Sequence, residues 1–537
     1  MAELEVDVVV VGSGIAGLSA ALAAQAHGFS TILVEKSTAV GGGTSHSYGL
    51  IWVGGNHIAE REGISDDMAD VRRYLDFLSG GHAETDRLEA FIRETPSAIR
   101  FFEDCGIPFL RIHGLTDHYF DRGPGSAETG RSIEAAPMSG YELGPWRQKL
   151  YTPPGVPFNI SAEELVGWGG IHSFSSWDRD TMENRKKEDF LGLGVGLVAR
   201  FLKALIDRDV PVWTDAALAE LVVEDGRTKG IVLTDGRMIG ARRGVVLATG
   251  GYESNLELAR NYDGLPGYRS IFPENISGDG MICGAEKGAA IRQIHQNLQL
   301  MLGFSMTATD TGKQTFRPAA IIELTSPHTI VVNRAGRRFA NEAYFQAVGP
   351  KLREFDPDTH QYVNLPCYLI FDSQYAQKFS FAGLPAGSAV PEWVERSDTM
   401  EGLADKLGMD PASLTATVGL FNAFCDQGRD ADFDRGANKW KLAAGTDPTV
   451  NSSLGRLDTG PFYGIELHPS VGASAGLATD VHGQVLHVRG HPMPGLYASG
   501  NAAAHTEFGT GYQAGLTLAS CMTFSLQAVR HMKAAAQ

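Results

Sequence analysis

The feature that most constrains the fold of this chain is a glycine motif that follows an apolar run. Residues 6–11 read VDVVVV, a β-branched stretch typical of a strand buried on both faces. The motif GSGIAG follows at residues 12–17, and a helical apolar pattern extends to residue 26. Gly28 ends that pattern, and residues 31–34 read TILV, a second strand. The sequence therefore predicts a βαβ unit.

Each glycine of this motif has a physical role in binding a pyrophosphate. The first allows a tight turn, the second lets the backbone approach the phosphates, and the third lets helix and strand pack closely. The helix then directs free N–H groups and the positive end of its dipole at the phosphates. Glu35 closes the second strand about twenty residues further on, where a carboxylate can bind ribose hydroxyls. A glycine-rich turn without a ligand is the alternative. It does not explain why a strand precedes the motif, a helix follows it and an acid closes the second strand.

Composition excludes several classes of partner. The chain has 537 residues, enough for two or more packed units, and a formal net charge of −17, which argues against nucleic acid or an anionic membrane as partner. Its five cysteines include no C-x-x-C pair, which fits a reducing compartment and predicts neither a disulfide scaffold nor a metal site. The N-terminal apolar run is too short for a signal peptide or a membrane span. We therefore expect a cytoplasmic protein.

Three further glycine clusters distinguish FAD from NAD. The sequence GGGTS at residues 41–45 resembles the point in FAD-binding oxidoreductases where the chain returns to the pyrophosphate and flavin. VVLATGG at residues 245–251 and GLYASGN at residues 495–501 resemble later FAD signatures of that group. The predicted FAD-binding residues are Gly12, Ser13, Gly14, Ile15, Ala16, Gly17, Glu35, Lys36, Gly42, Gly43, Thr44, Ser45, Thr249, Gly250, Gly251, Gly500, Asn501, Gly515, Leu516, Thr517 and Leu518.

The last of these residues begin a C-terminal helix. Residues 512–532 have helical character, and the N-terminus of this helix would point at the pyrimidine edge of the flavin. Its dipole could there stabilise the anionic reduced flavin.

Pieces of one domain at both ends of the chain predict an insertion between them. Residues 1–285 and 460–537 are assigned to a Rossmann-like FAD-binding domain, and residues 286–459 to an inserted α+β catalytic (capping) domain. The predicted fold class is therefore α/β with a discontinuous FAD-binding domain. Residues 212–240 alternate apolar and polar around a turn and predict a hairpin. Residues 120–185 have weak periodicity and predict a partly irregular excursion over the active site.

The order of these pieces resembles the fumarate reductase/succinate dehydrogenase flavoprotein superfamily over nearly the whole chain. GDGM at residues 278–281 and VNRAGRRFANE at residues 332–342 support that resemblance. Within the superfamily, three segments resemble the 3-ketosteroid Δ1-dehydrogenases: DHYFD at residues 117–121, GRSIE at residues 130–134 and YQAGLTL at residues 512–518. In the last segment the family usually has Tyr-Pro-Gly-Ala-Gly, so this chain is one residue shorter there and lacks the proline.

The resemblance implies removal of two hydrogens next to a ring ketone. A tyrosine hydroxyl and a glycine N–H bind the ketone oxygen in that family, and these roles fall on Tyr512 and Gly515. A tyrosine base removes the α proton, and flavin N5 takes the β hydrogen as hydride. The base is Tyr344 or lies elsewhere, and His118 or Tyr119 takes the role of the early tyrosine. The implied substrate is a steroid or a smaller cyclic ketone such as cyclohexanone, and the electron acceptor is unknown.

Two other functions compete with this one. An enoate or dicarboxylate reductase of the fumarate reductase kind needs arginines that clamp carboxylates. Residues 495–524 contain neither Arg nor Lys, although Arg317 or Arg338 could reach the site, and His468 resembles a His-Pro-Thr segment of those reductases. A flavin-containing electron-transfer or binding protein is the other alternative, but its function would not need a large inserted domain.

His46 bears on how FAD is held. It lies near the position where succinate dehydrogenase flavoproteins attach FAD covalently through a histidine. The 3-ketosteroid Δ1-dehydrogenases hold FAD non-covalently, so we expect non-covalent FAD here.

Overall fold

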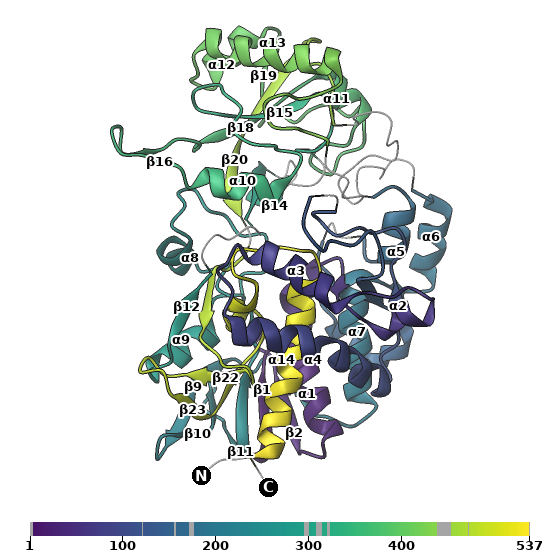
Figure 1. Cartoon of the computed structure of the whole chain (residues 1–537), viewed down its shortest axis with the longest axis vertical. Coiled ribbons are helices and arrows are strands. Elements are labelled where there is room, and N and C mark those ends of the chain that lie inside the picture. Colours follow the sequence, from purple (N-terminus) through teal and green to yellow (C-terminus); the bar gives the residue numbers. More distant parts are fainter. Residues whose placement is uncertain are drawn as a thin grey trace.

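The chain forms two main sheets, one above the other in Figure 1, with helices packed around them. The computed structural model describes residues 4–120, 122–154, 157–170, 177–294, 300–307, 314–318, 323–437, 453–470 and 472–535. Asp121, the last residue of the DHYFD segment, lies outside the described residues.

The first sheet has eight strands. Three of them lead into the glycine motifs at residues 12–17, 245–251 and 495–501, which we call the three FAD signatures. Its main path runs β22 (Gln484–Leu486), β23 (Pro492–Ala498), β11 (Met238–Leu247), β1 (Leu4–Val11), β2 (Thr31–Val34) and β8 (Val212–Trp213). β23, β11, β1, β2 and β8 are parallel, as expected for strands without exposed faces. The predicted hairpin is present as β9 (Leu218–Glu224) and β10 (Arg227–Leu233), which joins the sheet beside β11.

The register of this sheet explains why the three signatures meet. Val11 of β1 pairs with Val34 of β2 and with Leu247 of β11, and Leu247 pairs with Ala498 of β23. The residues that follow three of these strand ends are Gly12, Ala248 and Ser499, one in each signature, so the signatures meet at one edge of the sheet. Ligands of open parallel sheets bind at this carboxyl edge.

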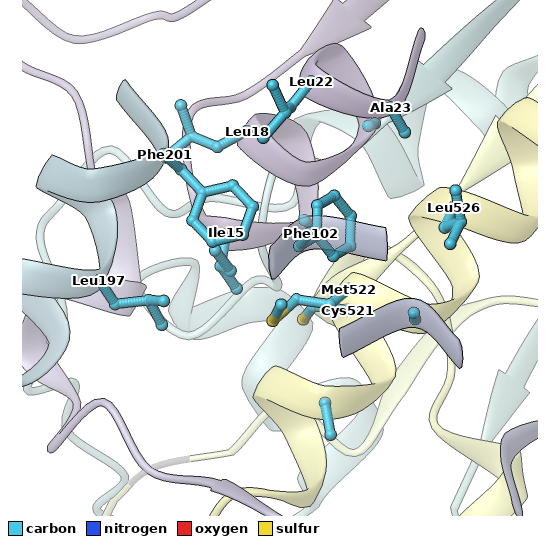
Figure 2. Packing of buried hydrophobic residues seen from close by; sticks show 14 of the residues in the cluster. Ile15, Leu18, Leu22, Ala23, Phe102, Leu197, Phe201, Cys521, Met522 and Leu526 are labelled. Carbon is cyan, nitrogen blue, oxygen red and sulfur yellow. The ribbon is translucent and has the colours of Figure 1, made fainter. Parts of the chain in front are cut away.

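Helices on one face of the first sheet supply its core. α1 (Ile15–Ala26) packs between α7 (Leu193–Ile206) and the C-terminal helix α14 (Leu516–Ala534), and α14 also packs on α4 (Thr85–Asp104). Figure 2 shows how Leu18, Phe102, Phe201 and Met522 from these helices point toward one another, and each is fully or almost fully buried. Burying one such side chain contributes about 1.5–3 kcal/mol, so this core fixes the N-termini of α1 and α14 relative to each other.

The second sheet has six antiparallel strands, and all of them except β20 come from the predicted insertion. Its order is β14 (Gln314–Pro318), β13 (Met301–Thr307), β20 (Phe462–Ser470), β18 (Cys367–Asp372) and β15 (Thr329–Asn333), and β19 (Glu395–Ser397) also pairs with β20. α12 (Met400–Lys406) and α13 (Pro411–Gln427) pack on it.

β20 corrects the predicted domain boundary at residue 460. The boundary assigned residues 460–470 to the FAD-binding domain, but β20 pairs with β13, β18 and β19 of the second sheet. The chain returns to the first unit at β21 (Ala475–Leu477), because Leu477 is buried in one cluster with side chains of the first sheet. Its partner strand β12 (Ile291–Gln293) pairs with it, although residues 286–459 were assigned to the insertion. A strand of the insertion cannot be distinguished by composition from a strand of the surrounding domain, which is why the sequence did not reveal this.

Short elements connect these units. They are η1 (Gly42–His46), β3 (Ile51–Trp52), α2 (His57–Arg61), α3 (Met68–Ser79), β4 (Phe109–Arg111), β5 (Ser132–Ala135), β6 (Met138–Ser139), η2 (Gly140–Lys149), α5 (Ala162–Gly167), α6 (Arg179–Lys187), β7 (Phe190–Leu191), α8 (Leu256–Asp263), α9 (Asp279–Glu286), α10 (Phe345–Leu352), β16 (Phe355–Asp356), β17 (Gln361–Tyr362), α11 (Ser373–Lys378), η4 (Gly500–Ala502) and η5 (Thr506–Phe508). Among the described helices, none has the length and apolar character needed to cross a membrane.

Candidate active site

A cleft opens at the carboxyl edge of the first sheet, and Met301 of the second sheet is among the residues that line it. Most of the predicted FAD-binding residues line it, from Gly12 after β1 to Leu518 in the first turn of α14. Three residues of the prediction, Gly17, Ser45 and Leu516, do not line it. A Cβ at Gly17 would lie 1.8 Å from the carbonyl oxygen of Gly12, so Gly17 serves helix–strand packing, while Ser45 and Leu516 are buried behind the cleft wall.

The backbone of this cleft fits a dinucleotide. Gly12 has φ +104°, and a Cβ there would lie 2.3 Å from the carbonyl oxygen of Ala248, so only glycine fits between the ends of β1 and β11. Gly42 also has positive φ, and a Cβ at Gly42 would meet open space. At Gly14, the α1 N-terminus faces the cleft across from the Thr44 side chain. These residues leave the close backbone approach that a pyrophosphate requires.

Glu35 has the burial and hydrogen bonds expected for a ribose-binding acid. Its carboxylate accepts hydrogen bonds from the Ser13 N–H (3.0 Å), the Ser13 hydroxyl (2.5 Å) and the Ser37 N–H (2.7 Å). Burial raises its pKa, while these donors act in the opposite direction. The neighbouring Lys36 donates to Asp279 (2.7 Å), so its charge is already paired in the cleft wall.

Asn501 is oriented by two residues that the sequence did not single out. Its amide nitrogen donates to the Glu253 carboxylate (3.0 Å), and its amide oxygen lies 3.1 Å from Nε2 of His505. Glu253 is buried and lines the same cleft, and burial raises its pKa. The side chain of Asn501 is therefore fixed where the third signature meets the cleft.

The opposite end of the cleft is built from four separate segments. Tyr512, Ala514 and Gly515 come from the turn before α14, which we call the 512–515 turn. Tyr48 and Leu50 follow η1, His118 comes from the DHYFD segment, and Met301 comes from β13 of the second sheet; all of them line the cleft. The surface here is aromatic and apolar, with few charges.

Gly515 has a conformation that only glycine adopts readily. Its φ is +95°, and a Cβ would lie 2.5 Å from the Trp52 nitrogen. Its carbonyl oxygen accepts hydrogen bonds from Trp52 N–H (3.2 Å) and Ala519 N–H (3.1 Å). No acceptor for its own N–H is present among the described residues, so this donor is left for a ligand at the start of α14.

Two phenols lie at this end of the cleft. Burial raises the pKa of Tyr512 to about 12, so it stays protonated and can donate a hydrogen bond near neutral pH. Burial also raises the pKa of Tyr48 to about 12, an effect that Arg317 opposes and Tyr512 reinforces. Sequence reasoning missed Tyr48, although it lies close after the GGGTS cluster at residues 41–45.

Tyr119 and Tyr344 are brought together from distant parts of the chain. Their rings meet edge to face with centroids 5.5 Å apart. The Tyr344 hydroxyl is buried and makes no hydrogen bond of good geometry within the described structure, although the two hydroxyls are close enough to affect each other's pKa. Burial raises the pKa of both tyrosines. Neither lines the cleft; both pack with Tyr512 in the core behind it.

The cations that a dicarboxylate would need are engaged elsewhere. Arg338 is buried between Glu342 (2.9 Å) and Asp430 (2.8 Å), and Arg317 lies 3.2 Å from Glu323. His468 lies on β20, where burial lowers its pKa, and it does not line the cleft. Among the described residues that line the cleft, Lys36 is the one Lys or Arg, and Asp279 pairs it. The described residues also contain no cluster that could hold a metal ion.

Comparison with known proteins identifies the family of this chain. An FAD binding domain family model matches residues 7–517. The chain is 33% identical to a 3-oxosteroid 1-dehydrogenase of Mycolicibacterium smegmatis over 99% of this chain and 98% of that protein. The chain belongs to the 3-ketosteroid Δ1-dehydrogenase-like family of FAD flavoproteins. It is an FAD-dependent oxidoreductase that acts on CH–CH groups, which excludes the non-enzymatic alternative.

Two other relatives show the range of this family. A 4-oxocyclohexanecarboxylate 2-dehydrogenase of Sinomonas cyclohexanicum is 32% identical over 98% of this chain and 92% of that protein. The crystal structure of 3-ketosteroid Δ1-dehydrogenase from Sterolibacterium denitrificans in complex with 1,4-androstadiene-3,17-dione is 27% identical, with a TM-score of 0.86, and covers 99% of this chain and all of that chain. A flavocytochrome c3 fumarate reductase, 21% identical with a TM-score of 0.62, shares the fold of the wider superfamily.

The state of His46 leads to a prediction about FAD attachment. His46 lines the cleft; Nε2 lies 3.2 Å from the Tyr151 hydroxyl, and burial lowers its pKa to about 4. Because Nε2 is already engaged by Tyr151, we expect FAD to be held without a covalent bond. Acid precipitation of the purified protein should leave the yellow colour in the supernatant. A yellow pellet would show a covalent bond, and His46→Ala would then be expected to release it.

Proposed function

We propose that this enzyme introduces a C=C bond α,β to the carbonyl of a neutral ring ketone, either a steroid or a smaller cyclic ketone. The observation that carries the proposal is that Tyr512 and Gly515, which can offer a hydroxyl and a backbone N–H as donors, both line an apolar end of the cleft. Such a pair suits a carbonyl oxygen that gains negative charge, and apolar walls suit a hydrocarbon ring.

The residues of the chain then have separate tasks. When bound, FAD supplies the hydride acceptor. Tyr512 and Gly515 donate hydrogen bonds to the ketone oxygen, which acidifies the neighbouring C–H and stabilises the enolate as the α proton leaves; one such donor typically contributes about 3–4 kcal/mol. Tyr344 is the proposed base, and Tyr119 is its ring neighbour. Both lie behind the cleft wall, so the proposal requires the cleft to open to the Tyr344 hydroxyl when the ketone binds. Tyr119 is only partly buried, so the pair offers a route for the proton from the core toward solvent.

The inserted domain is proposed to act as the cap of this site. It contributes Met301 to the cleft and Tyr344 to the tyrosine pair, so both binding and proton removal depend on its placement over the first sheet. A closed site excludes water, which would otherwise weaken the hydrogen bonds to the enolate.

The paired cations favour a neutral substrate over a charged one. A dicarboxylate held in a closed site without free cations would cost several kcal/mol. The Sinomonas cyclohexanicum relative is named for a ketone with one carboxylate. Here Arg317 is compensated by buried Glu323, so we expect cyclohexanone-type ketones or steroids to be preferred over their carboxylated counterparts.

Two assays on one preparation test the proposal. The first follows ketone-dependent reduction of an artificial dye, with a panel from cyclohexanone and 4-oxocyclohexanecarboxylate to 4-androstenedione. The second follows fumarate-dependent oxidation of a reduced viologen. We expect activity in the first assay and background in the second; activity in the second alone would favour the dicarboxylate reductase instead.

A further inference from the structure

His118 is buried where three parts of the chain meet. Its ring contacts the 512–515 turn on one side and Gln346 of α10 on the other. Its own segment is held by Asp117, whose carboxylate accepts hydrogen bonds from Trp52 Nε1 (2.7 Å) and Arg131 (2.9 Å). The backbone that carries the His118 ring is therefore held in place by the hydrogen bonds of Asp117.

His118 binds the 512–515 turn through both its backbone and its ring. Its backbone N–H donates to the Gln513 side-chain oxygen (2.8 Å), which also accepts the Tyr74 hydroxyl (2.7 Å). Its ring Nε2 accepts a hydrogen bond from the Ala514 N–H (3.3 Å), and the ring meets that of Tyr512 edge to face at 5.5 Å. His118 therefore helps to fix the positions of Gln513 and Gly515, the two residues on either side of Ala514 in the turn.

These contacts define the protonation of the ring. An amide N–H can only donate, so Nε2 must present its lone pair, and the neutral ring then carries its proton on Nδ1. Burial lowers the pKa of His118 to about 3, in agreement with a neutral ring. The terminal amide of Gln346 lies 2.5 Å from Nδ1, and the amide oxygen has no other partner in the described part of the chain. A half-turn of that amide places its oxygen to accept the Nδ1 proton.

We propose that His118 is a positioning residue that holds the 512–515 turn and couples it to the inserted domain. This inference rests on the proposed function, because the turn carries the two donors for the ketone oxygen. Nε2 faces Ala514 and Nδ1 faces Gln346, so both nitrogens are engaged with protein and His118 is not the base that removes the α proton. The role differs from the tyrosine-like one that the sequence left open for this residue.

Two variants separate positioning from base catalysis. His118→Leu fills the space but removes both polar atoms, and His118→Gln keeps an oxygen that can accept from the Ala514 N–H. With FAD bound, we expect kcat for the ketone to fall about 10- to 100-fold in His118→Leu and to recover to within about tenfold of wild type in His118→Gln, since a misplacement of 1 Å can cost about 100-fold. Both variants should keep the shape of the wild-type pH profile. Equal losses in the two variants, with one limb of the profile missing, would make His118 the base and overturn the proposal.

Hydrogen exchange tests the same idea without turnover. In the FAD-bound protein, the peptide that covers residues 512–516 should exchange faster in His118→Leu than in wild type, and at the wild-type rate in His118→Gln. Gln346→Leu, which leaves His118 in place, should show a smaller increase. If the wild-type enzyme converts no ketone, the proposed function fails while this measurement still decides the positioning role. An unchanged exchange rate of residues 512–516 in His118→Leu would overturn the positioning role of His118.

Discussion

Replacing Tyr344 by phenylalanine is expected to lower kcat for the ketone by about 100- to 10,000-fold, the usual contribution of a general base. The proposed α-proton acceptor is the Tyr344 hydroxyl, and phenylalanine removes it while keeping the ring that packs against Tyr119. FAD should stay bound, because Tyr344 does not line the cleft. The measurement is dye reduction at saturating ketone, together with the flavin absorbance spectrum of the variant.

Tyr48→Phe is the matched control for this variant. Tyr48 is also a phenol near Tyr512, but it lies in the cleft wall beside the FAD signatures and not in the tyrosine pair. We expect Tyr48→Phe to retain turnover within about tenfold of wild type, below the 100-fold that a general base supplies at the least. The opposite ranking of the two variants would assign proton removal to Tyr48.

The same proposal predicts how the rate depends on pH. A tyrosine accepts a proton only in its ionised form, and burial raises the pKa of both Tyr344 and Tyr119 above the usual value. The fraction of ionised base therefore grows as pH rises, and kcat for the ketone should increase into the alkaline range. A rate that falls from neutral to alkaline pH would contradict a tyrosine base.

The sequence predicted FAD as the cofactor because the signals for it are local. Each FAD signature is a strand followed by glycines, and parallel strands bring such ends to one edge of a sheet, as Val11 and Leu247 show. Gly17 lies behind that edge, and the motif gives the reason, because its third glycine serves the close packing of helix and strand.

The ketone end was harder to predict because its contacts are distant along the chain. His118 meets Gln346 at a separation of 228 residues and Ala514 at a separation of 396. No periodicity or spacing reports such a contact, so the sequence could propose His118 as a site residue without assigning its partners. β20 was placed in the wrong unit for the same reason, since its strand partners are set by the topology of the second sheet.

Tyr512→Phe is expected to lower kcat for the ketone by about 100- to 1,000-fold, the loss measured when one oxyanion donor is removed. The buried Tyr512 hydroxyl stays protonated, since its pKa is raised to about 12, so its role is to donate and not to accept a proton. Phenylalanine keeps the edge-to-face contact with the His118 ring, so the 512–515 turn should keep its place and FAD its affinity. The Gly515 N–H would remain as a second donor, which is why the loss should be partial.

Because a donor to the developing enolate acts mainly in the transition state, kcat should fall more than KM rises. Steady-state kinetics with one ketone, at matched FAD occupancy, measure both constants; a rise in KM with unchanged kcat would mean that Tyr512 only binds the substrate.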